Sequence, residues 1–114
     1  MEVLVHHIYE YEKGLRNLIL HTTSKNLKLE IEKRLNKKNI PFIIHEISGN
    51  KINIYFGNQH CIDVVNSINK VNLSEYTPEE DYILGIMLGY DRVKQCQRFL
   101  DRKNKRSSQQ KLIG

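Results

Sequence analysis

Histidine and cysteine are the residue types in this sequence best suited to bind a metal or to act as nucleophiles. The spacing of these residues contains no C-x-x-C, H-x-x-x-H or H-E-x-x-H pattern, which are the patterns typical of zinc sites. We therefore expect no metal site, no cofactor and no catalytic residues, and we interpret the histidines as ordinary polar residues of the fold. The residues in question are His6, His7, His21, His45, His60, Cys61 and Cys96.

The neighbouring pair His60 and Cys61 is the strongest candidate for thiol chemistry. Asn58 is a suitable N-cap for a helix that begins near His60, and the positive end of a helix lowers the pKa of a thiol placed there. A small thiol-based enzyme or sensor centred on Cys61 is therefore one hypothesis. We favour the alternative, in which Cys61 lies on the apolar stripe of its helix as unreactive packing and is not bonded to Cys96.

Positive charge is concentrated at the end of the chain. Residues 1–91 contain 10 Lys/Arg and 12 Asp/Glu, whereas residues 92–114 contain 8 Lys/Arg and a single Asp. The spacing of Lys94, Arg98 and Arg102 places them on one face of a helix, which we expect to be solvated. With Arg92, they are the candidate residues for binding an acidic partner.

Three functions are consistent with these features. The leading hypothesis is a non-enzymatic accessory or binding protein that meets an acidic protein through its basic C-terminal helix. The alternative is a sequence-independent nucleic-acid binder, although the basic segment has no interleaved stacking aromatic except Phe99, which we expect to be buried. The thiol-based enzyme or sensor is the third. A homodimer is a further option, because Gly85 and Gly89 are spaced for close helix contact.

The clearest local signals lie in the middle of the sequence. Two alternating, β-branched runs, 42–47 and 51–56, flank a short turn that contains Gly49, and they predict a β-hairpin. Thr77, Pro78 and Glu80 form a capping box that starts a helix. We expect that helix to extend to about residue 103, although its continuity through Gly85 and Gly89 stays open. Its predicted core stripe is Ile83, Ile86, Tyr90, Val93 and Leu100.

The remaining segments are assigned from hydrophobic spacing. Val3–Tyr9 alternates like a strand, residues 15–21 have apolar residues at helical spacing, and residues 22–24 supply caps for a helix that ends near 39. A further helix follows Asn58.

These elements give an α+β fold in the order β-α-α-β-β-α-α. We expect a small three-stranded, mainly antiparallel sheet with helices packed mostly on one face. Residues 1–103 form a single domain and residues 104–114 a basic, polar, disordered tail. The longest apolar stretch, residues 82–90, is too short to cross a membrane, and we expect a cytoplasmic protein without a membrane partner.

Several of these segments resemble a known family. The run TPEEDYILGIMLGYD at residues 77–91, the opening Val5–Glu10, and the stretch from Tyr55 to Ile62 are similar to a small bacterial family catalogued as domain of unknown function 2023. The resemblance covers most of residues 1–100. It implies a compact α+β fold and no known activity or functional residue. It also suggests flavodoxin genes as neighbours, which makes an acidic, flavodoxin-like protein a conceivable partner.

Overall fold

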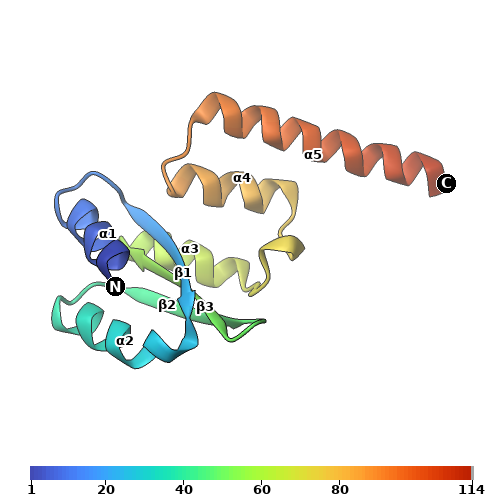
Figure 1. Cartoon of the computed structure of the whole chain (residues 1–114). Coiled ribbons are helices and arrows are strands. Elements are labelled where there is room, and N and C mark those ends of the chain that lie inside the picture. Colours follow the sequence, from blue (N-terminus) through green and yellow to red (C-terminus); the bar gives the residue numbers. More distant parts are fainter. Residues whose placement is uncertain (114) are drawn as a thin grey trace.

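The computed structural model describes the backbone of residues 1–113 and the side chains of residues 1–105. It contains a three-stranded sheet and five α-helices, with two 3₁₀ turns, so the α+β fold class is confirmed (Figure 1). The elements are α1 (Glu2–Glu12), β1 (Leu18–Ser24), η1 (Lys25–Leu27), α2 (Lys28–Lys37), β2 (Phe42–Ile47), β3 (Lys51–Gly57), α3 (Gln59–Ile68), η2 (Leu73–Glu75), α4 (Pro78–Met87) and α5 (Arg92–Ile113).

The sheet is antiparallel with strand order β1-β3-β2. Strands β2 and β3 form the predicted hairpin, with Ile47 opposite Lys51 next to the turn. Gly49 and Asn50 turn the chain with left-handed backbone, at φ of 74° and 57°. Strand β1 also pairs with β3, so β3 is the central strand of the sheet.

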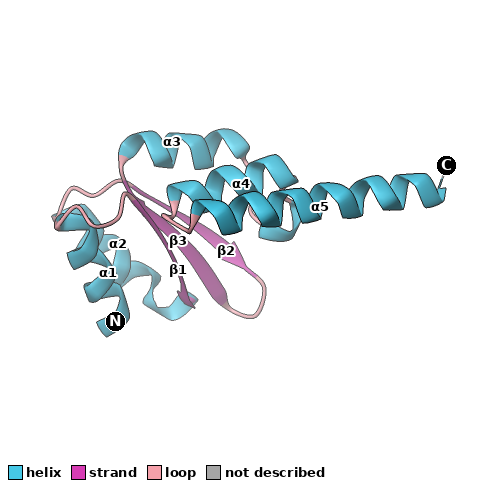
Figure 2. Cartoon of the chain, turned by 90° about the horizontal axis from the view of Figure 1, so that it is seen from above, coloured by secondary structure: helices cyan, strands magenta, loops and turns pink. Residues whose placement is uncertain are grey.

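Helices cover both faces of the sheet, and the expectation that they pack mostly on one face is wrong (Figure 2). On one face, α1 and α2 bury Leu4, Ile8, Ile31 and Leu35 against the sheet. On the other face, α3 and α4 contribute a second apolar cluster around Tyr55. Ile52, Ile54 and Phe56 of β3 lie in the first cluster and Tyr55 lies in the second, so the central strand is buried on both faces.

The first two elements are the reverse of those predicted from the sequence. Residues 2–12 are a helix and residues 18–24 are a strand, so the order begins α-β rather than β-α. In α1, Leu4 and Ile8 are one helical turn apart and buried, whereas Val3 and Val5 are exposed. The alternation of apolar residues at the start of the chain therefore concealed a helix with a narrow buried stripe.

The long C-terminal helix is interrupted rather than continuous. Helix α4 ends at Met87 and is followed by Gly89, whose φ is 84°. The N–H groups of Gly89 and Tyr90 donate to the carbonyls of Ile86 and Gly85. This is a Schellman motif, in which glycine adopts the left-handed conformation at little cost. Asp91 then caps α5, because its Oδ1 accepts from the backbone N–H of Lys94 at 2.9 Å.

Helix α5 extends beyond the body of the protein (Figures 1 and 2). Its backbone is helical to Ile113. The division of the chain into a domain of residues 1–103 and a disordered tail of residues 104–114 stays a prediction. The side chains of residues 106–113 and all of Gly114 lie outside the described part of the chain. No helix in the described part is both long and apolar enough to span a bilayer.

Candidate functional site

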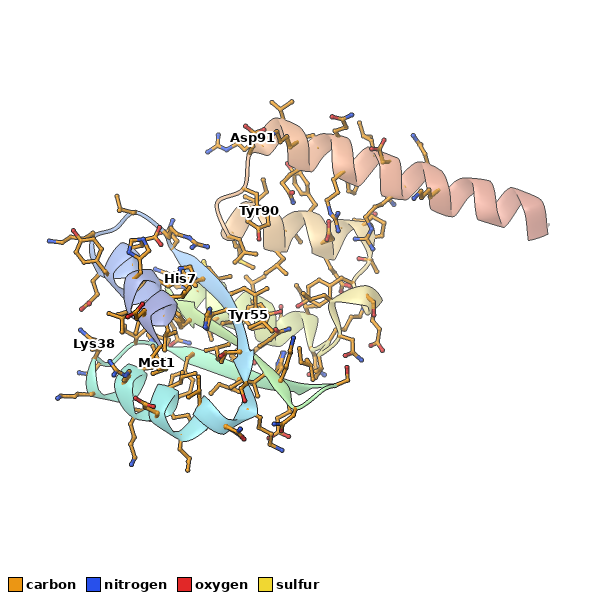
Figure 3. The ribbon with its side chains drawn as sticks, in the orientation of Figure 1. Met1, His7, Lys38, Tyr55, Tyr90 and Asp91 are labelled. Atoms are coloured by element: carbon orange, nitrogen blue, oxygen red, sulfur yellow. The ribbon has the colours of Figure 1, made fainter. Side chains whose placement is uncertain are left out.

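Helices α4 and α5 form a hairpin that turns at Tyr90 and Asp91 (Figure 3). All four residues predicted to bind a partner lie on α5. The start of the hairpin is well defined by local chemistry. The Thr77 hydroxyl accepts from the N–H of Glu80 at 3.2 Å, and the Glu80 carboxylate accepts from the N–H of Thr77 at 2.9 Å. The predicted capping box is therefore confirmed.

Two of the predicted partner-binding residues, Arg98 and Arg102, instead hold the hairpin together. Arg98 donates from Nε and Nη2 to the two carboxylate oxygens of Asp81 at 2.8 and 3.0 Å. Arg102 donates to the carbonyl of Tyr76 at 3.0 Å, and its Nη1 lies 3.3 Å from Asp81 Oδ1. The expectation that this helix face is simply solvated is wrong, because Asp81 is brought next to it by the turn at Gly89.

Arg98 and Arg102 also lower the pKa of the Asp81 carboxyl group. The Arg98 hydrogen bond is the main cause that lowers the pKa of the Asp81 carboxyl, with the charges of Arg98 and Arg102 acting in the same direction. Burial opposes the shift without reversing it. Asp81 is therefore an ionised anchor for α5.

The contact between the two helices is close at Gly85. A side chain at this position would overlap the amide group of Gln95, which is a buried polar residue of α5. The interpretation of Gly85 as a site of close helix approach thus holds within the chain. Gly89 has the separate role of ending α4.

The apolar side of the hairpin faces outward. We use the name apolar hairpin face for Tyr82, Ile83, Val93, Cys96, Phe99 and Leu100. Val93 is 77% exposed and Leu100 is 56% exposed, so the core stripe predicted from the sequence is largely a surface. Phe99, which was expected to be buried, is partly exposed.

The apolar hairpin face is hollowed at its centre. Tyr82, Ile83, Cys96, Phe99 and Leu100, with Glu79 at the margin, line a cavity of about 470 Å³. The rings of Tyr82 and Phe99 meet edge to face at 5.7 Å, and the Tyr82 hydroxyl lies 3.7 Å from the Cys96 sulfur. The floor of the cavity is therefore fixed by contacts between the two helices.

Cations lie around this apolar face. Lys103 pairs with Glu79 and lies over the Phe99 ring at 5.9 Å from its centroid. The other two predicted partner-binding residues, Arg92 and Lys94, are exposed in the first turn of α5. Residues 92–105 hold six Lys/Arg and one Asp, so α5 presents positive charge beside its apolar residues.

The candidate thiol pair, His60 and Cys61, lies on helix α3 and not on the α4–α5 hairpin. The Asn58 side chain accepts from the N–H of His60 at 2.9 Å, which is the predicted N-cap. Cys61 is partly buried beside the second apolar cluster, and this burial raises the pKa of its thiol. The raised pKa disfavours the thiolate that a reactive site needs. Cys61 and Cys96 are both free.

The histidines do not converge on a metal site. His7 lies on α1 and meets His21 of β1, with ring centroids 5.5 Å apart, whereas His45 lies on β2 against Tyr55. Within residues 1–105, no group of three or more His, Cys, Asp or Glu side chains could hold a metal ion.

Comparison with known proteins gives one family. The model of the protein family described as "Protein of unknown function (DUF2023)" matches residues 2–102. The chain belongs to the DUF2023 family. No curated protein matches it. The DUF2023 match includes all of α4 and the first half of α5, so the hairpin and its apolar face lie within the family domain up to residue 102.

Sequence reasoning missed the apolar hairpin face as a surface. The available signal was the set of polar residues Gln95, Arg98 and Arg102, which recur at helical spacing and could have been assigned to the packed side of α5. That assignment requires the break at Gly89, since only a hairpin brings Asp81 and Gly85 to this side.

Proposed function

We propose that this DUF2023 protein is a non-enzymatic accessory protein that binds an acidic protein partner through the apolar hairpin face. One observation carries the proposal: α5 packs on α4 largely through polar side chains and exposes its apolar ones. An apolar patch rimmed by polar residues is typical of a protein interaction site. Burying Val93, Ile83 and Leu100 against a partner would supply binding free energy that the monomer leaves unused.

The charge of α5 supports an acidic partner. Arg92 and Lys94 are exposed next to the apolar residues, and charge complementarity at the rim of an interface raises association rates. Two copies of this chain packed through α5 would instead bring the same positive charges together. The charge thus favours a different, acidic protein over a homodimer. A flavodoxin-like protein, suggested by the family resemblance, is a suitable first candidate.

Nucleic-acid binding has less support. Arg98 and Arg102, two of the four predicted contacts, are already committed to Asp81 and Tyr76. Phosphate binding would also leave the exposed leucine and valine side chains without a role. We further propose that the protein acts in the cytoplasm, which the two free cysteines favour.

The proposal is tested by purifying the tagged protein from its native cells with its partner. The double variant Ile83→Ser/Leu100→Ser should lose the partner, because two apolar contacts are removed. The matched control Leu29→Ser changes an apolar residue of α2 that is 72% exposed, and it should retain the partner.

The character of the partner is tested next. Nuclease treatment should leave the complex intact, and binding should weaken as salt rises, because exposed charges are screened within about 8 Å at physiological salt. Release of the partner by nuclease, or its retention by the double variant, would contradict the proposal.

A further inference from the structure

A second surface lies on the opposite side of the sheet, in the groove between α1 and α2. The groove has a volume of about 770 Å³, and Val5, Ile8 and Tyr9 of α1 form its apolar wall. Tyr9 is 53% exposed and Val5 is 46% exposed, so this wall is open to solvent. The volume is in the range of about 300–1,000 Å³ that is usual for small-molecule sites.

The other wall of the groove is basic. It is formed by α2, which contributes Lys33, Arg34, Lys37 and Glu30, with Lys38 at its end. The net charge of residues 1–91 does not reveal this basic wall, because acidic residues elsewhere in residues 1–91 balance the positive charge of α2.

Two of the four cations are neutralised within the protein. Arg34 lies 3.5 Å from Glu30, and Lys38 donates to Glu12 across the groove at 3.1 Å. Among the residues that the structure describes, no ion pair involves Lys33 or Lys37. These two ammonium groups are one helical turn apart and therefore share a face of α2. The groove thus combines an apolar wall with two uncompensated positive charges.

We infer that this groove binds a small amphipathic anion, a carboxylate or phosphate ester with an apolar chain or ring. The negative group lies against Lys33 and Lys37, and the apolar part lies against Val5 and Tyr9. An amphipathic helix of another protein fits less well, because such a helix needs anchors over two or three turns. The apolar wall offers three side chains near one level of α1.

The test uses decanoate below its micellar concentration, with decan-1-ol as the neutral analogue. Calorimetry should show decanoate binding, with at least a tenfold lower affinity for decan-1-ol. The variant Lys33→Gln/Lys37→Gln should weaken decanoate binding about tenfold, because each exposed ion pair contributes up to about fivefold in affinity. Tyr9→Ser should weaken the binding of both decanoate and decan-1-ol, because it removes part of the apolar wall.

A matched control separates the groove from overall charge. Lys25→Gln/Lys28→Gln removes the same charge from residues that pair with Glu46 outside the groove, and it should leave decanoate binding unchanged. Decanoate should perturb backbone amide NMR resonances of α1 and α2 rather than those of α4 and α5.

The source of the anion is tested with vesicles that contain anionic lipid. A groove for free amphiphiles predicts that the protein stays in the supernatant when the vesicles are sedimented. Absence of decanoate binding, equal binding by the Lys33→Gln/Lys37→Gln variant, perturbation confined to α4 and α5, or sedimentation with the vesicles would each overturn the inference. Absence of decanoate binding, or equal binding by the Lys33→Gln/Lys37→Gln variant, would leave the proposal for the apolar hairpin face unaffected.

Discussion

Asp81→Asn removes the charge that holds α5 against α4. Asp81 accepts two hydrogen bonds from Arg98 and lies 3.3 Å from Arg102. Hydrogen bonds to buried charged groups contribute about 1.5–3 kcal/mol, whereas exposed ion pairs contribute about 0–1 kcal/mol. The Asp81 side chain is 20% exposed and that of Arg98 is 56% exposed. We therefore expect Asp81→Asn to lower the free energy that holds α5 against α4 by an intermediate amount, about 1–2 kcal/mol.

The loss should be local, because α5 projects from the body and lies mainly against α4 (Figure 1). Native-state hydrogen exchange measures the free energy of such local opening. A loss of about 1–2 kcal/mol corresponds to exchange about 5–30-fold faster for the α5 amides of residues 95–105. Amides of β3, at the centre of the sheet, should exchange at the wild-type rate.

The control is Asp63→Asn, which makes the same chemical change on α3, where Asp63 is exposed and accepts from Gln59. It should leave α5 exchange unchanged. If Asp81→Asn also leaves α5 exchange unchanged, the hairpin is not held by this ion-pair network, and the account of its polar packing fails.

Acid should have the same effect as the substitution. The pKa of folded Asp81 is lowered by Arg98, so it lies below the value of about 3.9 that aspartate has in an unfolded chain. A lowered folded-state pKa stabilises the fold above the unfolded value, and this contribution is lost as the pH falls below about 4. Wild-type α5 exchange, corrected for its intrinsic pH dependence, should therefore approach that of Asp81→Asn in acid.

Three further predictions concern the rest of the fold and the thiols. Thr77→Ala should lower the free energy of unfolding by about 1 kcal/mol, measured with denaturant, because it removes the N-cap acceptor of α4; a change of a few tenths would contradict the cap. Gly57→Ala should cost at least about 2 kcal/mol, because its φ is 144° and a Cβ would overlap the Asn17 carbonyl; wild-type stability would show that the strand end can relax. Exposed Cys96 should react with a thiol reagent at neutral pH well before Cys61, whose pKa is raised by burial; rapid labelling of Cys61 would instead revive the thiol-sensor hypothesis.

Elements whose signals are local could be predicted from the sequence. The β2–β3 hairpin, the Asn58 cap and the capping box at Thr77 each depend on residues within a few positions of one another. Such signals depend little on the rest of the fold.

Elements that depend on residues distant in the sequence could not be predicted from the sequence. Strand β1 is stabilised by pairing with β3, in which Ile19 lies opposite Phe56, and nothing near residue 19 reveals that partner. Short apolar runs are ambiguous between helix and strand by periodicity alone. The same limit applied to Arg98, because its partner Asp81 is 17 positions away and becomes a neighbour only after the turn at Gly89.

The most direct test of the proposed function is the affinity of the purified partner for Leu100→Asp. This substitution places a negative charge at the centre of the apolar hairpin face, at a residue exposed enough for the fold to tolerate it. Leu29→Asp on α2 is the matched control. We expect Leu100→Asp to weaken binding at least about 100-fold, since it removes an apolar contact of about 1.5–3 kcal/mol and adds repulsion toward an acidic surface. Equal affinities of wild type and Leu100→Asp for the partner would contradict the proposal.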